Sequence, residues 1–437
     1  MTGNDQLMTE GRLVFEEMPD AEHKLLKVYP QVQRQEIIGF GGAFTESAAF
    51  TFSQMSEADR DKVIELYFGK NGSSYSLCRT HIQSCDFSLG SYSYINDPDD
   101  RILATFSIER DKEYIIPMVL AALEKNPDIS FLASPWSPPD FMKTNGEMCH
   151  GGSLKKEYYG MWADMMTRYV EEYRKLGIMV NRLTVQNEPK AVQTWDSCIY
   201  SSEEEKLFAC QYLNAALKNK DLSDVRINVW DHNKERVFDR AASILSDEIS
   251  KAAISGIAFH WYSGDHFEAV ALTREEFPDK ELIFTEGCVE YSRYKKSNSI
   301  TYAEMYAHDM IGTLAAGANG YIDWNLLLNT DGGPNHVGNY CDAPIMYDSQ
   351  KSEIHIHLTY YYIGHISRFV LPGARRMPVS RYTDKLEAVG FVNPDGQRVM
   401  IVLNRTDDDL PFHLMENLQI SQTAIPSHSI MTLIWNS

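Results

Sequence analysis

Features typical of metal, membrane and nucleotide-binding proteins are missing from this sequence. The seven cysteines form no Cys-x-x-Cys pair and no ladder with histidines, which argues against a zinc site and against a secreted disulfide framework. No apolar run approaches 18 residues, so no transmembrane helix is predicted. A G-x-G-x-x-G fingerprint and a P-loop are both absent, which disfavours a bound dinucleotide or a cradled phosphate.

Positive charge is also scarce. Lys and Arg number 41 against 61 Asp and Glu, and the formal net charge is −20 at pH 7. Such a surface repels nucleic-acid phosphates and anionic lipid headgroups. We therefore expect no nucleic-acid partner and no membrane insertion, while the oligomeric state stays open.

The first ten residues are polar and lack the basic patch and apolar stretch of a signal peptide. This favours a cytoplasmic protein whose cysteines stay reduced. The 437 residues, 43% hydrophobic and 23% charged, are typical of a globular protein with one large and one small domain.

Short runs rich in β-branched and aromatic residues alternate with longer amphipathic segments through the middle of the chain. Eight runs predict strands, at Ile37–Gly42, Tyr75–Arg79, Ile129–Ser134, Arg182–Asn187, Arg226–Asp231, Gly256–Tyr262, Leu282–Glu286 and Tyr321–Asn325. Helices are predicted between them, at Ser56–Gly69, Ser107–Asn126, Glu157–Leu176, Ser202–Asn219, Lys234–Ser250 and Tyr302–Gly317. Eight alternating units favour an α/β fold of the (β/α)8 TIM-barrel type, although an open doubly wound sheet would alternate in the same way.

The two ends of the chain differ from this middle part. Strand-like runs follow Gly373, at Leu386–Val392, Val399–Asn404 and Ile430–Trp435, and further ones lie at Arg12–Phe15 and Lys24–Tyr29. They predict a small all-β side domain, built from the C-terminus and joined by N-terminal strands. The expected boundaries are 1–35 for the N-terminal strands, 36–360 for the barrel and 361–437 for the side domain.

Two glutamates stand at ends of predicted strands, which is where a barrel places its catalytic groups. Glu188 follows the fourth strand and Glu286 ends the seventh. A carboxylate there is costly if it is desolvated without a partner. Each could simply cap a loop or pair with an arginine. Because the fourth and seventh strands face each other across such a barrel, the pair favours a functional role.

Two facing carboxylates are what cleavage of a glycosidic bond requires. One protonates the leaving oxygen, and the other attacks the sugar or activates water. A separation of about 5–5.5 Å would give retention of configuration through a covalent intermediate.

Other strand ends carry aromatic and hydrogen-bonding side chains of the kind that bind sugars. These are Arg79, Asp86, Trp136, the His260-Trp261-Tyr262 run and the Asp323-Trp324-Asn325 run. Aromatic faces pack on the apolar face of a pyranose, and Asp or Asn bonds its hydroxyls. Any one of these aromatics could be ordinary barrel core, but their convergence at four strand ends favours a sugar pocket.

Together, these residues resemble glycoside hydrolase family 30, and most closely its glucosylceramidase-like branch. The matching stretches are Gly39-Phe40-Gly41-Gly42-Ala43, Ser84-Cys85-Asp86-Phe87-Ser88, Ala133-Ser134-Pro135-Trp136-Ser137, Lys143-Thr144-Asn145-Gly146, Asn187-Glu188-Pro189, His260-Trp261-Tyr262, Asp323-Trp324-Asn325, Gly332-Gly333-Pro334-Asn335 and Val402-Leu403-Asn404-Arg405. They follow the family order over nearly the whole chain. The resemblance implies a (β/α)8 barrel with a β-sandwich side domain, and retaining, exo-acting hydrolysis of a β-glycoside without a metal or other cofactor.

The resemblance also implies roles for single residues. Glu188 would be the acid/base and Glu286 the nucleophile, which Arg79 and Tyr262 would orient. Asn187 would hold the sugar 2-hydroxyl. Asp86, Trp136, Trp324 and Asn339 would line the sugar subsite, with Asn339 near the 6-hydroxyl.

The chain departs from the glucosylceramidases at three places. Thr45-Glu46 stands where they carry Thr-Asp, Trp195 lies in a shorter loop, and His336 replaces a tryptophan. The last two lie at the aglycone mouth by this resemblance, so ceramide recognition is not expected.

The sequence therefore predicts a retaining exo-β-glycosidase, and first a β-glucosidase acting on small β-glucosides. The alternatives within the family are a β-xylosidase and an endo-β-1,6-glucanase. From other classes, a catalytically dead glycan-binding protein and a cofactor-dependent barrel oxidoreductase fit less well. For catalysis, Glu286 is expected to stay ionised near Arg79, and its charge to keep a proton on Glu188.

Overall fold

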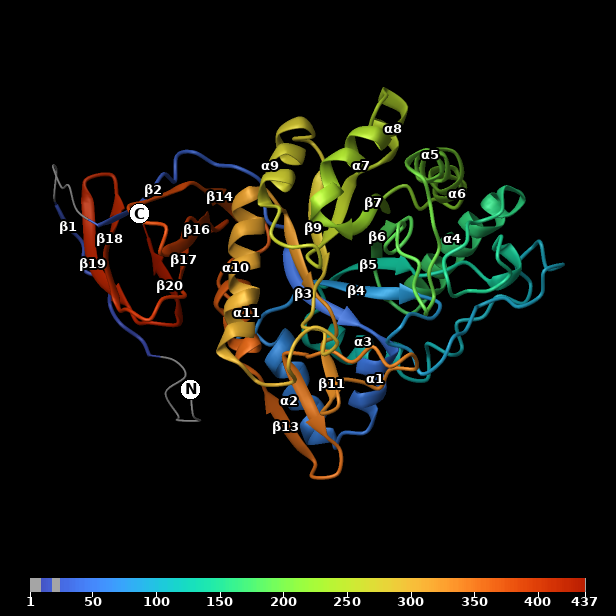
Figure 1. The fold of residues 1–437 in the computed structure, drawn as a ribbon, viewed down its shortest axis with the longest axis horizontal. Helices are drawn as coiled ribbons and strands as arrows, with labels where there is room; N and C mark the ends of the chain where they lie inside the picture. The colour runs from blue at the N-terminus through green and yellow to red at the C-terminus, as the bar shows by residue number, and fades with distance from the viewer. Residues whose placement is uncertain (1–8, 18–23, 437) are drawn as a thin grey trace. The chain divides into compact units, whose positions relative to one another are not determined.

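The computed structural model describes residues 9–17 and 24–436. Contacts divide the chain into two compact units (Figure 1). One contains Phe40–Lys296 and Gly320–Ile356, and the other the described residues of Met1–Gly39, Ser297–Asn319 and His357–Ser437. No helix among the described residues is long and apolar enough to cross a membrane.

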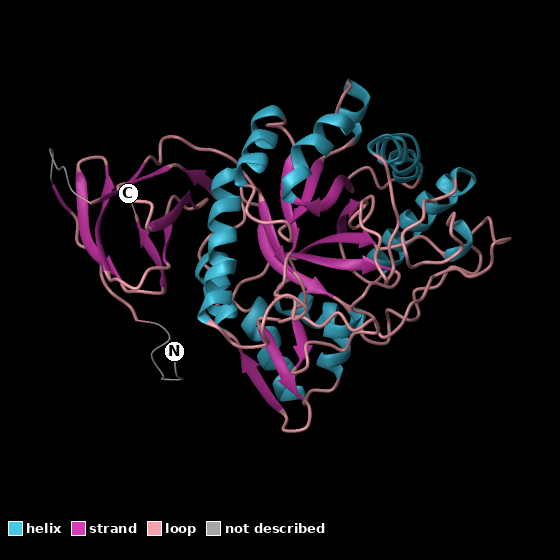
Figure 2. Cartoon of the chain, in the orientation of Figure 1, coloured by secondary structure: helices cyan, strands magenta, loops and turns pink. Residues whose placement is uncertain are grey.

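Eight strands form a closed parallel barrel in the order β10-β3-β4-β5-β6-β7-β8-β9 (Figure 2). They are β3 (Gly39–Phe44), β4 (Leu77–Ile82), β5 (Ser130–Pro135), β6 (Val180–Thr184), β7 (Arg226–Asn233), β8 (Gly256–His260), β9 (Glu281–Glu286) and β10 (Gly320–Asp323). Each overlaps one of the eight predicted runs. The TIM barrel is therefore confirmed, and the open sheet is not formed because β10 closes on β3.

Close packing of the first two barrel strands explains the glycine-rich run at the start of the barrel. A Cβ atom at Gly41 would lie 1.8 Å from the carbonyl oxygen of Leu77 on the neighbouring strand β4. No side chain fits there, so Gly41 is needed for strand packing.

Helices occur between the barrel strands, and several have the ends that the sequence predicts. Within the barrel unit they are α1 (Glu46–Ser53), α2 (Glu57–Phe68), α3 (Ile115–Lys125), α4 (Tyr159–Lys175), α5 (Ser202–Leu207), α6 (Asn214–Asn219), α7 (Val237–Ile244), α8 (Glu248–Ala253) and α9 (Phe267–Glu276). Short helical turns lie at η1 (Asp140–Met142), η2 (Lys156–Tyr158), η3 (Phe208–Leu213) and η4 (Lys234–Arg236). Ser56 caps α2 by accepting a hydrogen bond from the backbone N–H of Asp59.

Two predicted helices are wrong in extent. The segment before Ile115 is irregular because Asp111 is buried there and accepts hydrogen bonds from three tyrosine hydroxyls, those of Tyr92, Tyr94 and Tyr173. The predicted helix Lys234–Ser250 is interrupted before Asp247, which caps the new helix α8 in a capping box with Ser250. A small sheet of β11 (Leu327–Asn329), β12 (Ile345–Asp348) and β13 (Glu353–Ile356) completes this unit.

The second unit contains a β-sandwich and two helices. One sheet has the order β1-β19-β18-β2-β15 and the other β14-β16-β17-β20. The strands are β1 (Glu16–Glu17), β2 (Leu25–Val28), β14 (Arg375–Met377), β15 (Val379–Arg381), β16 (Leu386–Val392), β17 (Arg398–Asn404), β18 (Leu410–Glu416), β19 (Gln419–Ile425) and β20 (Ser429–Trp435). Side chains from both sheets share one apolar core, which includes Leu26, Met400 and Phe412. In Figure 1 the blue N-terminal strands lie with the red C-terminal ones, so the predicted side domain is confirmed.

Details at this end differ from the sequence prediction. Arg12–Phe15 is not a strand, and the short strand β1 begins only at Glu16. Strands β18 and β19 were not among the predicted runs, and Pro411 lies inside β18 opposite Ala424. Helices α10 (Ile300–Ala316) and α11 (Leu358–Ser367) belong to this unit by their contacts.

Candidate active site

A cavity of about 230 Å³ opens at the carboxyl ends of the barrel strands. Nine of the ten residues predicted for the site line it: Asp86, Trp136, Asn187, Glu188, Trp195, Tyr262, Glu286, Trp324 and Asn339. The tenth, Arg79, lies beneath the cavity and is fully buried. These residues lie at strand ends and on loops far apart in the sequence, and only closure of the barrel brings them together.

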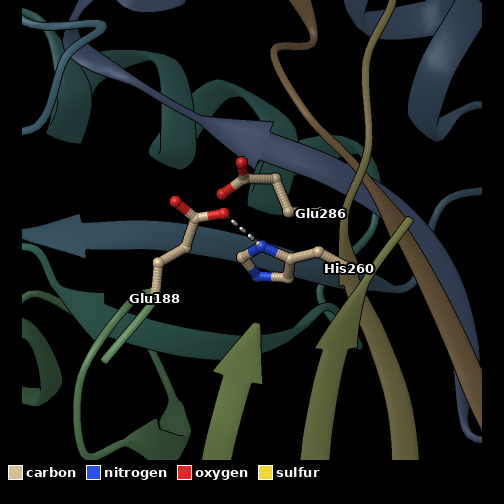
Figure 3. Close-up of side chains that lie close together, drawn as sticks. All are labelled: Glu188, His260 and Glu286. Atoms are coloured by element: carbon tan, nitrogen blue, oxygen red, sulfur yellow. Dashed lines mark hydrogen bonds and ion pairs between the residues drawn. The ribbon is translucent and has the colours of Figure 1, made fainter. Parts of the chain in front are cut away.

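Glu188 and Glu286 face one another across this cavity (Figure 3). A carboxylate oxygen of each and a ring nitrogen of His260 all lie within 4.8 Å of one another. Glu286 is the last residue of β9, whereas Glu188 follows β6 in a left-handed conformation with φ 49°. The backbone N–H of Glu188 donates to the carbonyl oxygen of Asp231 (2.9 Å), which fixes that turn.

Arg79 lies beneath the cavity and donates hydrogen bonds to three side chains of the site. Its Nη1 donates to Glu286 Oε2 at 2.6 Å, and its Nη2 donates to Asp231 Oδ2 at 2.7 Å and to Asn187 Oδ1 at 2.9 Å. Burial opposes the charge of Arg79, but Asp231 and Glu286 raise its pKa above the usual value. The guanidinium therefore stays charged and orients three side chains at once.

Tyr262 and Arg79 hold the two oxygens of Glu286 from different sides. The Tyr262 hydroxyl donates to Oε1 at 2.9 Å and also lies 3.4 Å from the Cys288 sulfur. Burial raises the pKa of Glu286 above its usual value, while His260 and Arg79 act against that rise.

Aromatic, amide and carboxyl side chains line another part of the cavity. Trp136 and Trp324 are stacked, with ring centroids 5.3 Å apart. Asn339 Nδ2 donates to Asp86 Oδ2 at 3.0 Å. Burial, together with the charge of Glu286, raises the pKa of Asp86 to about 8, so this carboxyl is largely protonated at neutral pH.

Trp195 and Gln193 lie on the loop after Glu188, and both line the cavity. Gln193 Nε2 donates to Glu188 Oε2 at 3.4 Å. The loop is tied down by Lys143, whose ammonium is buried and donates to the carbonyl oxygens of Met148 and Ser197. By contrast, Glu46, which replaces the family's aspartate, pairs with Arg110 and does not line the cavity.

Two central residues were given no role of their own by the sequence: Asp231 was not among the predicted site residues, and His260 was named only as part of the His260-Trp261-Tyr262 run. Asp231 lies on β7, and His260 ends β8. The sequence signal was present, because Asp231 ends the predicted strand Arg226–Asp231 and His260 lies near the end of the predicted strand Gly256–Tyr262. Asp231 is fully buried and His260 lies between it and Glu188, so the site contains a titratable chain that the paired-glutamate pattern alone does not predict.

His260 changes the charge state expected for Glu188. Burial opposes the charge of its imidazole, but Glu286, Asp231 and Glu188 together raise the pKa of His260 to about 9. Burial would raise the pKa of Glu188, yet the hydrogen bond from His260 lowers it to about 2. The expectation that Glu188 holds the proton under the influence of Glu286 therefore left out this neighbour.

Glu188, His260 and Glu286 are also the one trio among the described residues whose spacing could suit a metal ion. Both oxygens of Glu286 already accept hydrogen bonds, from Arg79 and Tyr262. The nearby guanidinium repels a cation, so we assign no metal to this trio.

Comparison with known proteins identifies the family. The glycosyl hydrolase family 30 TIM-barrel domain matches residues 37–370, and the family 30 beta sandwich domain matches residues 373–433. The chain belongs to glycosyl hydrolase family 30. It is therefore an O-glycoside hydrolase of a retaining family, and a carbohydrate substrate follows from this membership.

Relatives of this family 30 chain include enzymes with different named substrates. The lysosomal acid glucosylceramidase of Mus musculus is 34% identical over 430 residues, covering 94% of this chain and 83% of its own length. The crystal structure of SrfJ from Salmonella typhimurium superposes with a TM-score of 0.94 at 45% identity, covering 97% of this chain and 95% of that one. The endo-beta1,6-glucanase BT3312 has a TM-score of 0.87 at 27% identity and covers 94% of each chain.

Proposed function

We propose that this protein is a retaining exo-β-glycosidase that hydrolyses small β-glucosides by double displacement. The observation that carries the proposal is the pair of glutamates facing each other across the cavity. An oxygen of Glu188 lies within 4.8 Å of an oxygen of Glu286. Retaining enzymes hold their carboxyl groups about 5–5.5 Å apart, whereas inverting enzymes need about 6.5–9.5 Å to admit a water.

In the first step Glu286 attacks the anomeric carbon while Glu188 gives its proton to the leaving oxygen. The glycosidic C–O bond breaks, and a covalent glycosyl ester forms on Glu286. Arg79 and Tyr262 hold the nucleophile in place through the hydrogen bonds on its two oxygens.

In the second step a water molecule attacks the glycosyl ester. Glu188, now ionised, takes the water's proton, and Glu286 leaves as a carboxylate. We assign to Asn187 the hydrogen bond to the sugar's 2-hydroxyl in both steps, and its bond from Arg79 Nη2 supports this role by holding the amide in place.

The size of the cavity supports exo action on one sugar ring. Pockets for drug-sized ligands span about 300–1,000 Å³, so a volume of about 230 Å³ suits a single pyranose. Asp86 and Asn339 offer hydrogen-bond partners to its hydroxyls, and Trp136 and Trp324 offer aromatic faces.

The sugar assignment rests on the relatives. The glucosylceramidases, of which the mouse enzyme is 34% identical, support glucose at the cleaved position. The 27% identity to BT3312 supports an endo-β-1,6-glucanase as the second candidate. Discrimination between glucose and xylose would depend on contacts to the 6-hydroxymethyl group, for which we propose Asn339.

The proposal is tested by nitrophenol release from matched β-glucoside, β-xyloside, β-galactoside and β-fucoside, comparing kcat/KM. A preference for the glucoside is the expected result. A xyloside preference would keep the mechanism and change the sugar. Cleavage only within a β-1,6-glucan would replace exo by endo action. Glu286→Gln is the matched control and should abolish every activity, and retained turnover would contradict its assignment as nucleophile.

A further inference from the structure

Asp231 is the most heavily bonded carboxylate of the site, although the proposed two-glutamate mechanism does not use it. Its Oδ2 accepts from Arg79 Nη2 and from the hydroxyls of Ser134 and Thr184, at 2.7, 3.0 and 2.8 Å. Its Oδ1 accepts from the Thr285 hydroxyl at 2.6 Å and lies 3.0 Å from His260 Nε2. With so many donors, Asp231 stays ionised, and its pKa lies well below the usual value despite burial.

The backbone around Asp231 is strained. Trp230 and Asp231 both have positive φ, 76° and 50°, at a register shift between β7 and β8. Such a conformation is unfavourable for residues other than glycine, and bulges of this kind often redirect a side chain beside an active site. Here the bulge directs the carboxylate of Asp231 to Arg79 and His260.

His260 connects this fixed carboxylate with Glu188. Its Nε2 faces Asp231 Oδ1, and its Nδ1 lies 3.3 Å from Glu188 Oε1 (Figure 3). The ring is fully buried. Because ionised Asp231 can only accept, Nε2 must carry a hydrogen. Nδ1 then either donates to ionised Glu188 or accepts from protonated Glu188, so the contact is a hydrogen bond in both cases.

Titratable and charged groups surround His260 on several sides. Asp231 and His232 lie on the neighbouring strand β7 and Glu286 on the neighbouring strand β9, while Arg79 lies on β4 and Glu188 follows β6. The ring centroid of His232 is 6.5 Å from that of His260, and that of Tyr262 is 6.1 Å away. His232 Nε2 lies 3.9 Å from Glu188 Oε1, but burial lowers the pKa of His232, so this ring holds a proton less well than His260 does. The three carboxylates Asp231, Glu188 and Glu286 therefore outnumber the one arginine, and a proton on His260 lowers the excess negative charge from two to one.

We propose that His260 and Glu188 share one proton, which lies on His260 Nδ1 in the empty enzyme and on Glu188 Oε1 when substrate is bound. This inference rests on the proposed function, because the shared proton is the one that Glu188 gives to the leaving group. His260 and Asp231 are positioning residues in this scheme, since neither touches the substrate.

The transfer is balanced at each step. The Nδ1–H bond of the imidazolium breaks, the Oε1–H bond of Glu188 forms, and the ring is left neutral with its hydrogen on Nε2 against Asp231. A glycosidic oxygen only accepts hydrogen bonds and displaces water from Glu188, so its arrival favours the protonated carboxyl. The leaving group departs with this proton, and Glu188 then takes a new proton from the attacking water. When the product leaves, this new proton moves from Glu188 back to His260.

A shared proton has a kinetic signature with a fixed sign. A second site for the same proton can only raise the apparent pKa at which the pair loses it. The pH dependence of kcat/KM reports the free enzyme. Its alkaline limb should therefore fall at a higher pH with His260 than without it. A histidine that only filled space would change the rate but not the position of this limb.

The experiment measures kcat/KM against pH on a phenyl β-glycoside of the preferred sugar, a poor leaving group that needs the acid. His260→Gln keeps a donor for Asp231, and His260→Asn keeps a polar group at Nδ1, but neither takes up a proton. Both should move the alkaline limb down by about one pH unit or more. The control His365→Gln replaces a half-buried histidine bonded to Thr432 in the other unit and should leave the alkaline limb in place.

A second measurement needs neither turnover nor a stable His260 variant. In ¹⁵N-histidine-labelled wild-type enzyme without substrate, one buried imidazole should remain protonated above pH 7.5. Glu188→Gln should lower the pKa of that imidazole, because it removes the adjacent negative charge. An unmoved alkaline limb in folded His260 variants, or no such histidine in the spectrum, would overturn the shared proton. Lack of activity on all aryl glycosides would instead contradict the proposed function and leave the spectroscopic result standing.

Discussion

Arg79 Nη1 lies 2.6 Å from Glu286 Oε2, and the arginine side chain is completely buried beneath the cavity. The same guanidinium bonds Asp231 and Asn187, so one residue of β4 aligns groups from three other strand ends. The proposed nucleophile therefore depends on a cation that the substrate itself does not reach.

We expect Arg79→Lys to lower kcat/KM by about 100-fold or more. Lysine keeps the charge but lacks the planar fork that bonds three acceptors at once. Arg79→Met should also lower the free energy of unfolding by about 3–5 kcal/mol, because it leaves Asp231 and Glu286 buried without their cation. Thermal melts and steady-state kinetics measure both effects.

The control Arg110→Lys alters the Arg110–Glu46 pair, whose arginine side chain is 38% exposed, and should change the free energy of unfolding by about 1 kcal/mol or less. Equal effects at the two positions would contradict the special role of Arg79.

Glu188→Gln should separate substrates by their leaving groups. Loss of the acid slows departure of a poor leaving group such as phenol by about 10²–10⁴-fold, whereas dinitrophenol departs with little protonation. Comparison of kcat/KM on phenyl and dinitrophenyl glycosides of one sugar tests this. Similar losses on both, with no accumulation of the glycosyl ester, would remove Glu188 from the acid role.

Asp86→Asn should lower activity while it raises stability at alkaline pH. The folded-state pKa of Asp86, about 8, lies above the usual 3.8 because of burial. A raised pKa favours folding at low pH, and this contribution is lost as pH rises toward the folded value. Asparagine never ionises, so the Tm advantage of the variant should grow between pH 4 and 8 and then level off.

Thermal scans at several pH values, with kcat/KM alongside, check this prediction. The expected gain in Tm is a few degrees at pH 8, against a loss of roughly 10–100-fold in kcat/KM from the missing hydroxyl partner. A Tm difference that does not depend on pH would show that Asp86 ionises normally.

Trp195→Ala should weaken binding beyond the cleaved sugar. Trp195 lies on the loop after Glu188 and lines the cavity without belonging to the Trp136–Trp324 stack. An aromatic contact is worth about 0.5–1.5 kcal/mol beyond buried area, which corresponds to roughly 2–10-fold in affinity. KM for a β-linked disaccharide should rise by this factor, while KM for a methyl β-glycoside stays nearly constant. The opposite order would place Trp195 at the cleaved sugar.

In the sandwich unit, His428→Gln should destabilise the protein at acidic pH and have less effect at alkaline pH. His428 Nδ1 lies 2.8 Å from Glu304 Oε1, and Nε2 lies 3.0 Å from Asp407 Oδ1. Hydrogen bonds to Asp407 and Glu304 raise the pKa of His428. Protonated His428 therefore stabilises the folded protein below the unfolded-state pKa of about 6.5. This stabilisation is lost as pH rises through the folded-state pKa. Tm measured at pH 5.5 and 9 tests this, with His355→Gln as the control on β13.

Much of this protein could be predicted from the order of its residues alone. The eight barrel strands are local runs of β-branched and aromatic residues, so their existence follows from short-range pattern. Glu188 and Glu286 stand out because a carboxylate at the end of an apolar strand has few structural uses. Asp86, Trp136, Tyr262 and Trp324 follow from the same strand-end pattern, whereas Asn187, Trp195 and Asn339 were predicted from the resemblance to family 30.

What the sequence by itself could not determine was decided by contacts across the barrel. Whether β10 closes on β3, which puts Arg79 under Glu286, depends on packing between residues more than 200 positions apart. The bulge that directs Asp231 inward has no local sequence signal, and the charge state of Glu188 follows from His260, 72 positions away. Pattern reveals which side chains sit at strand ends, but the pKa of a buried group depends on distances and desolvation, and these exist only once the chain has folded.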